Sequence, residues 1–224
     1  MVAPAGASAT IESMPDRSAS HWKRTYAERR IGELSWTESV PAMSLELIAQ
    51  AGLASDAAII DVGGGASRLA AELLGLGHSD VTVADISAKA LDLAKADLGE
   101  DADRVTWVEA DVRFHDFGRR FDLWHDRAVF HFMVDAADRD RYLAVLSRSL
   151  RPGGHLILAT FGPDGPTECS GLPVARYRAE EISSVLGEDY ELLSSQLIEH
   201  RTPSGRTQQF TYAHLRRRGT PGSG

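Results

Sequence analysis

The sequence predicts an α/β fold: a seven-stranded, mainly parallel sheet with helices on both faces and an antiparallel hairpin at its C-terminal end. Short apolar runs alternate with helical patterns along most of the chain. The run "AAIIDV" at 57–62 is apolar at successive positions, as expected of a strand buried on both faces of a parallel sheet. The last two strand-like segments are separated only by "RTPSGR", whose Pro, Ser and Gly indicate a hairpin turn.

The individual elements follow from these patterns. The predicted parallel strands are the apolar runs at 57–62, 81–87, 104–111, 120–126 and 155–161. The predicted helices carry apolar residues three and four positions apart, at 44–53, 69–74, 88–98 and 138–150. Ser87 and Asp138 are the expected N-caps of the last two helices, and Pro152-Gly153-Gly154 should close the final one. A short helix at 178–187 then leads to the hairpin strands, 190–200 and 207–217.

Composition narrows the classes of protein to consider. The 224 residues suffice for one α/β domain with a full core. A net charge of -8 argues against binding nucleic acid over a broad surface, and the basic run at 216–218 is expected to be a solvated tail. Cys169 is the only cysteine, which excludes an internal disulfide and a cysteine metal cluster, so no metal is expected. Without a long apolar run or a leader pattern, we expect a cytoplasmic protein with no membrane partner.

The two ends of the chain differ in composition from its middle. Residues 1–20 are small and polar without apolar periodicity, so a disordered tail is expected there, and residues 219–224 should be flexible. Residues 21–218 should form a single domain, of which 21–50 is an N-terminal helical segment. Trp22 and Tyr26 in that segment are four positions apart, so they share one helical face and bring large apolar area that must be buried.

Three consecutive glycines, Gly63, Gly64 and Gly65, join the first parallel strand to its helix. Such a turn gathers backbone N–H groups and the positive end of the helix dipole around one small cavity, which suits an anion or a carboxylate. Gly63 and Gly65 are expected to tolerate no larger side chain, and Gly64 to be less demanding. Ser67 stands where a dinucleotide fingerprint has its third glycine. On its own, the loop could also be a tight turn without a ligand.

Two acids follow the glycine loop at strand ends. Asp85 ends the second strand about 20 residues after the loop, the distance at which a carboxylate meets ribose hydroxyls, and Asp111 ends the third strand. Each acid alone could be a helix cap or part of a solvated turn. Together with the loop they mark the carboxyl ends of neighbouring parallel strands, where ligands bind in open α/β sheets. The expected ligand has a ribose and a charged group, with a ring near Asp111.

With these motifs in place, the sequence resembles a class I S-adenosylmethionine-dependent methyltransferase from about His21 to Arg217. The resemblance is carried by "IIDVGGGAS", "VTVADIS", "VEAD", "FDLWHDRAVFHF" and "LRPGGHLILATF", with the terminal hairpin similar to the family's inserted antiparallel strand. It implies a Rossmann-like sheet and S-adenosyl-L-methionine as cofactor, with S-adenosyl-L-homocysteine as product. "HWKRTYAER" and "ELSW" also resemble a subgroup with an N-terminal W-x-x-x-Y segment that closes as a lid, whose members include protein-lysine methyltransferases.

The resemblance also implies roles for individual residues. Asp61 should orient the amino end of the methionyl group, with room provided by Gly63, Gly64 and Gly65. Asp85 should bind both ribose hydroxyls. Ile86 should pack on the adenine, Asp111 should accept from its amino group, and Val112 should offer a backbone N–H. The cofactor contacts expected in full are Trp22, Tyr26, Asp61, Gly63, Gly64, Gly65, Asp85, Ile86, Asp111, Val112 and His125.

A general base is needed when the acceptor must lose a proton, and the fourth strand offers the first candidates. His125 and Asp126 should face the methyl-transfer cleft at its end, with His131 shortly after; Glu168, Cys169 and Tyr177 are further candidates. The alternatives are structural: a core histidine at 131, an internal ion pair of Asp126 with the following arginine, and a packing role for Cys169.

The acceptor is less defined than the cofactor. The sequence lacks the Asn/Asp-Pro-Pro-Tyr/Phe pattern after the fourth strand, which argues against DNA-base or glutamine-amide methylation. A small molecule or a protein side chain such as lysine, methylated at oxygen, nitrogen or sulfur, stays open, as does the oligomeric state. Two alternatives are a cofactor-binding partner subunit without catalysis and a nicotinamide-dependent oxidoreductase, although the sequence has no Tyr-x-x-x-Lys.

Overall fold

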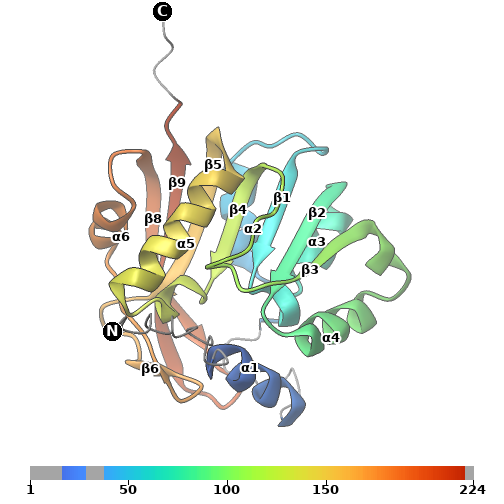
Figure 1. Cartoon of the computed structure of the whole chain (residues 1–224), viewed down its shortest axis with the longest axis horizontal. Coiled ribbons are helices and arrows are strands. Elements are labelled where there is room, and N and C mark those ends of the chain that lie inside the picture. The colour runs from blue at the N-terminus through green and yellow to red at the C-terminus, as the bar shows by residue number, and fades with distance from the viewer. Residues whose placement is uncertain (1–16, 29–37, 220–224) are drawn as a thin grey trace, which may run out of the picture.

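A seven-stranded sheet forms the centre of the molecule (Figure 1), in a computed structural model that describes residues 17–28 and 38–219. Its strands are β1 (Ala58–Val62), β2 (Asp80–Asp85), β3 (Val105–Glu109), β4 (Phe121–Arg127), β5 (Leu150–Phe161), β8 (Tyr190–Arg201) and β9 (Thr207–Arg217). Their order is β3-β2-β1-β4-β5-β9-β8. The first five are parallel, whereas β9 runs antiparallel to both β5 and β8. The predicted fold class is therefore confirmed.

Helices cover both faces of the sheet, as predicted. One face packs against α5 (Ala136–Ser149) and α6 (Ala179–Leu186), through a core that includes Trp124 and Tyr142. The other face packs against α2 (Ala42–Gln50), α3 (Leu69–Gly75) and α4 (Ala88–Leu98). Because successive side chains of a strand point to opposite faces, neighbouring residues of β1 and β4 enter different cores. In the described part of the chain, no helix has the length and apolar character needed to cross a membrane.

The smaller elements lie around the carboxyl ends of the parallel strands. The helix α1 (Arg17–Glu28) crosses this end of the sheet and packs against α4 (Figure 1). A short ribbon of β6 (Glu168–Cys169) and β7 (Leu172–Pro173) follows β5. Residues 17–20, expected in the N-terminal tail, are helical, so that boundary was wrong by four residues. Residues 1–16, 29–37 and 220–224, which hold the rest of both expected tails and part of the N-terminal segment, lie outside the described residues.

Three expectations about helix and strand ends were wrong. The helix α5 begins at Ala136, and Asp138 lies in its first turn, where it pairs with Arg113 and Arg141 instead of capping. Pro152-Gly153-Gly154 lies inside β5, because this strand already begins at Leu150, which pairs with Phe121 of β4. The register between β4 and β5 shifts after this pair, so that the three residues fit within the strand. The run at 216–218 is not a solvated tail, since Arg217 ends β9 and donates to the carbonyl oxygens of residues 147 and 150.

Candidate functional site

The glycine loop is tied to the end of the neighbouring strand. Gly63 has a positive φ of 71°, and its N–H donates to Ala84 O at 2.7 Å. The Asp85 carboxylate accepts from Gly65 N at 3.1 Å and from Ser87 N at 2.8 Å, so one side chain joins the loop to the turn after β2. Burial raises the pKa of Asp85 to about 6, although these backbone hydrogen bonds oppose the rise.

Close contacts explain why side chains are excluded from this loop. A Cβ at Gly63 would overlap the Val129 side chain, and one at Gly65 would lie 2.8 Å from the Asp85 carboxylate. The expectation that Gly64 is less demanding was wrong, because a Cβ there would overlap Oδ2 of the buried Asp61. All three glycines are therefore required by close packing of the protein itself.

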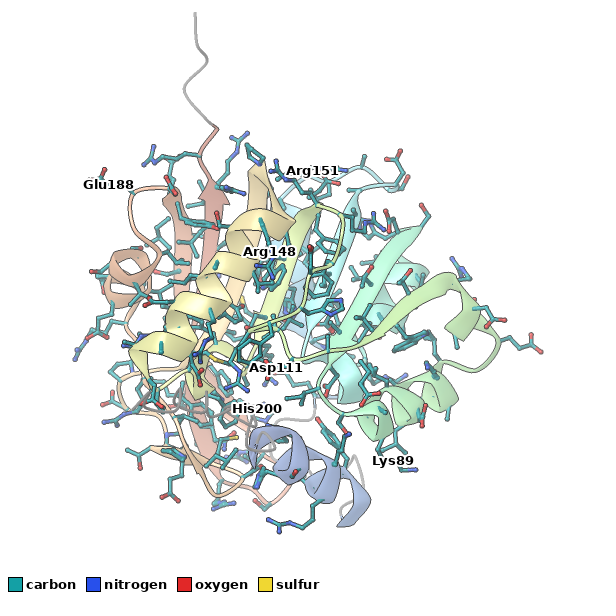
Figure 2. All side chains as sticks on the ribbon, viewed as in Figure 1. Lys89, Asp111, Arg148, Arg151, Glu188 and His200 are labelled. Atoms are coloured by element: carbon teal, nitrogen blue, oxygen red, sulfur yellow. The ribbon has the colours of Figure 1, made fainter. Side chains whose placement is uncertain are left out.

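Two adjoining cavities open beside the loop, at the carboxyl end of the sheet. The larger has a volume of about 130 Å³ and mostly apolar walls. The smaller, of about 40 Å³, is more polar. Val62, Gly63 and Arg127 line both, so the cavities meet at these three residues. Figure 2 shows Asp111 and His200 toward this end of the molecule, where α1 lies, whereas Arg151 and Glu188 lie at the opposite end.

The larger cavity combines aromatic walls with the two predicted acids. Trp22 and Tyr26 of α1 line it as neighbours, with ring centres 6.2 Å apart. Asp85 and Asp111 line it as well, and Arg113 holds the Asp111 carboxylate at 2.5 to 3.1 Å while also reaching Asp138. Its remaining lining residues are Ala84, Ile86, Ala110, Val112, Ala128, Val129, Phe132, Met133 and Cys169.

The smaller cavity contains a chain of buried polar side chains. Asp61 Oδ1 lies 2.7 Å from His125 Nδ1, and His125 Nε2 lies 2.9 Å from Ser44 Oγ. Within the described structure, Asp61 Oδ2 is buried without a hydrogen-bond partner. Glu38 and Arg68 also line this cavity. A buried carboxylate oxygen without a partner is costly, so a ligand that donates a hydrogen bond or carries positive charge is favoured here.

Asp126 does not face either cavity. It is fully buried on the opposite face of β4 and accepts hydrogen bonds from Tyr142 Oη at 2.6 Å and from the N–H groups of Val129 and Phe130. Burial raises its pKa to about 6, opposed by these hydrogen bonds. Its carboxylate stabilises the turn after β4, which includes Ala128 at a φ of 70°.

The other base candidates divide in the same way. His131 is fully buried in the core, where its ring nitrogen Nδ1 accepts from Phe161 N at 3.4 Å, and burial, with the charge of Arg127, lowers its pKa to about 3. Neither Glu168 nor Tyr177 lines the two cavities. Cys169 does line the larger cavity, but burial raises its thiol pKa to about 11. His125 lines the smaller cavity with both ring nitrogens already engaged.

Most of the predicted cofactor residues come together around the cavities. Gly64 and Gly65 line neither and act through the loop. Sequence reasoning missed several lining residues: Glu38, Ser44, Arg68, Arg127, Val129, Phe132 and Met133. For Arg127 a signal existed, because it follows directly after two site candidates at the carboxyl end of a strand.

Comparisons with known proteins agree with this arrangement. Residues 59–154 match the family described as a methyltransferase domain. The O-methyltransferase cnsE of Penicillium expansum is 33% identical over 123 residues, 53% of this chain and 43% of that protein. Nodulation protein S of Rhizobium tropici is 30% identical over 80 residues, 36% of this chain and 33% of that protein. The chain thus spans less than half the length of these curated relatives.

Solved structures match over nearly the whole chain. The 1,6-didemethyltoxoflavin-N1-methyltransferase of Burkholderia thailandensis, solved with 1,6-didemethyltoxoflavin and S-adenosylhomocysteine, has a TM-score of 0.69 and 25% identity, covering 97% of this chain and 93% of that one. The N-methyltransferase NodS of Bradyrhizobium japonicum, solved with S-adenosyl-l-homocysteine, has a TM-score of 0.64 and 17% identity, covering 87% and 97%, which shows the fold. The family match over residues 59–154 and the shared seven-stranded sheet support a class I S-adenosylmethionine-dependent methyltransferase.

Proposed function

We propose that the chain is an enzyme that transfers a methyl group from S-adenosyl-L-methionine to a small molecule, at oxygen, nitrogen or sulfur. The observation that carries the proposal is the pair of adjoining cavities, one polar and one mostly apolar, that meet at Gly63 and Arg127. When bound, the cofactor supplies a methyl group on a sulfonium: the acceptor lone pair forms the new bond to carbon as the carbon–sulfur bond breaks, which leaves S-adenosyl-L-homocysteine.

The residues of the smaller cavity fit the amino-acid end of this cofactor. The unpartnered Oδ2 of Asp61 would accept from the ammonium group, and Arg68 would attract the carboxylate. His125 is then a positioning residue: through Asp61 Oδ1 and Ser44 Oγ it connects the β1 carboxylate to α2. It would hold Asp61 in place instead of removing a proton from the acceptor.

The residues of the larger cavity fit the nucleoside. Asp85 would accept from the ribose hydroxyls with the lone pairs that the loop leaves available. Ile86 and Val112 would contact the adenine, and Asp111, held by Arg113, would accept from its amino group. These roles come from the family resemblance and are supported by the position of all four residues in one cavity wall.

The N-terminal segment belongs to the proposed site as a lid. We propose one methyltransferase domain that begins with α1 and extends to about residue 218, with α1 closing over cofactor and acceptor. Trp22 lies in the cavity wall, its ring centre 5.2 Å from that of Phe132, and α1 packs on α4. A cavity with aromatic walls covered by a helix favours a small acceptor over a protein lysine. The named relatives, an O-methyltransferase and an N1-methyltransferase of 1,6-didemethyltoxoflavin, support a small acceptor and leave its atom open.

Titration calorimetry of the full chain with S-adenosylmethionine and S-adenosylhomocysteine tests the proposal. We expect saturable binding of both, and at least tenfold weaker binding by Asp85→Asn. Asp80→Asn is the matched control: Asp80 begins the same strand at the other end of the sheet and pairs with Arg119. No saturable binding at millimolar cofactor would refute the proposal.

Two further assays separate the alternatives. A transfer assay with a labelled methyl group and a panel of small acceptors distinguishes an enzyme from a partner subunit, which would bind the cofactor without turnover. Incubation with NADH, followed by absorbance, tests the oxidoreductase alternative, for which we expect no change.

A further inference from the structure

We infer that Arg127 selects the acceptor, which is an acidic hydroxyl group on a planar aromatic ring and binds in its ionised form. The inference rests on the proposed methyltransferase function and names its substrate class. It follows from the position of Arg127, from the charges around it, and from the side chains that line the larger cavity.

Arg127 is held rigidly where the two cavities meet. It is the last residue of β4, and its side chain is 11% exposed. Its Nε donates to Tyr212 Oη at 2.9 Å, and one terminal nitrogen donates to Glu38 Oε1 at 3.0 Å. The guanidinium carbon lies 4.8 Å from the centre of the Phe210 ring. A cation fixed in this way binds an anion with little loss of side-chain entropy.

The turn behind Arg127 is fixed as well. The Asp126 carboxylate accepts from Val129 N at 2.9 Å and from Phe130 N at 3.1 Å, and Ala128 N donates to Ala159 O at 2.8 Å. Ala128 keeps a positive φ of 70°, which is uncommon for a residue with a side chain. The turn therefore presents Arg127, Ala128 and Val129 together in the wall of the larger cavity.

The charges around Arg127 leave its positive charge facing the larger cavity. Glu38 is its carboxylate partner; burial would raise the pKa of Glu38, but His200 and Arg127 outweigh it and lower that pKa. Glu38 lines the smaller cavity and not the larger one. Among the described residues, three further titratable groups lie near Arg127: Tyr212, Cys169 and His131. All three are neutral, because burial raises the pKa of the phenol and of the thiol and lowers that of the imidazole. His125 also contributes to the lowered pKa of Glu38, and its ring is hydrogen-bonded to Asp61.

The larger cavity offers no free base among its described lining residues. Its candidates are Asp85, Asp111 and Cys169. Asp85 is bonded to the loop and would use its remaining lone pairs for the ribose hydroxyls, Asp111 is paired with Arg113, and the thiol holds its proton to a pKa of about 11. An acceptor that needs deprotonation must therefore lose its proton to water before methylation, which favours an acidic group.

The walls and the charge together define the acceptor. A protonated amine would face the fixed cation of Arg127, whereas an oxyanion is attracted to it. Trp22, Tyr26 and Phe132 supply aromatic surface, against which a planar ring packs well. A phenol or a hydroxylated heteroaromatic ring of low pKa satisfies both conditions.

The test uses 4-nitrophenol, whose ionised form absorbs visible light, with the full chain saturated by S-adenosylhomocysteine. We expect the bound probe to ionise about tenfold more readily than the free probe, a shift of about one pKa unit or about 1.4 kcal/mol. Arg127→Met should abolish the shift and Arg127→Lys should restore part of it. Arg119→Met is the matched control, because Arg119 precedes the other end of β4 and bonds to Asp80.

Several outcomes would overturn the inference. One is a probe that binds with an unshifted ionisation, or that shows no saturable binding while S-adenosylhomocysteine binds normally. Another is Arg127→Met weakening S-adenosylhomocysteine binding more than probe binding, which would assign Arg127 to the cofactor. Loss of S-adenosylhomocysteine binding by the wild-type chain would instead refute the proposed function and, with it, the acceptor assignment.

Discussion

Gly63→Ala should destabilise the protein through two separable effects. The first is conformational, because Gly63 has a φ of 71° and an L-residue in this region costs about 1–2 kcal/mol. The second is steric, because the new Cβ would overlap Cγ2 of Val129, where carbon atoms normally stay about 3.5–4.0 Å apart. Overpacking of this kind costs about 1–3 kcal/mol. We therefore expect the free energy of unfolding to fall by about 2–5 kcal/mol.

Two matched variants separate these effects. Gly52→Ala is the conformational control, since Gly52 has a φ of 62° but no atom within 4 Å of the position of a Cβ. It should lose only the first part, about 1–2 kcal/mol. Combining Gly63→Ala with Val129→Ala removes the overlapping methyl group, so the double variant should be more stable than the sum of the single effects by about 1–3 kcal/mol.

Equilibrium unfolding in urea, followed by tryptophan fluorescence, measures the wild-type chain, the three single variants and the double variant, and calorimetry with S-adenosylhomocysteine reports on the site. Because Gly63 lines both cavities, Gly63→Ala should also weaken binding, whereas Gly52→Ala should not. Equal destabilisation by Gly63→Ala and Gly52→Ala, or strict additivity with Val129→Ala, would show that the loop is not packed against the turn after β4.

Three further predictions concern buried polar groups. Ser44→Ala removes the hydroxyl that bonds to His125 Nε2, so the free energy of unfolding, measured with urea, should fall by about 1–3 kcal/mol. The affinity for S-adenosylhomocysteine should fall too. An unchanged affinity would refute the proposed link from Ser44 through His125 to Asp61. Burial raises the pKa of Asp126 from 3.8 to about 6, so its contribution to the free energy of unfolding should decrease by up to about 3 kcal/mol as the pH rises from about 4 to 6. Asp126→Asn should remove this pH dependence. Identical profiles of stability against pH for the wild type and the variant would contradict the prediction. Burial raises the pKa of the Cys169 thiol from 9.0 to about 11, so at neutral pH its thiolate should be about 100-fold scarcer than that of an exposed cysteine. Alkylation of Cys169 by iodoacetamide should therefore be about 100-fold slower than alkylation of free cysteine, and equal rates would contradict this.

The fold was predictable because its signals are local and repeated. Apolar runs such as "AAIIDV" and helices with regular spacing each identify one element, and their alternation implies a parallel sheet. The errors lie where an end depends on a distant partner. Aspartate is a residue type that often caps helices, but the Asp138 carboxylate forms ion pairs with Arg113 and Arg141 from the first turn of α5. Pro152-Gly153-Gly154 has the composition of a loop, but Leu150 already pairs with Phe121 in β4.

The position of the two acids was predictable for the same reason, because Asp85 ends β2, Asp111 follows β3, and these two strands lie side by side. The base candidates were not, because one position along a strand decides the face. In β4, His125 points toward α2 and Asp126 toward α5. A sheet covered by helices on both faces has no polar side, so the sequence does not reveal which residue faces which helix.

Arg127 illustrates the remaining limit of sequence reasoning. A basic residue after an acid at a strand end suggests a local ion pair, yet its partners Glu38 and Tyr212 lie 89 and 85 positions away in the chain. Only the folded sheet brings the N-terminal segment and the terminal hairpin to the same guanidinium. The residue that we expect to choose the acceptor is therefore positioned by two segments that lie outside the strand-end motifs, and no pattern local to β4 reveals its partners.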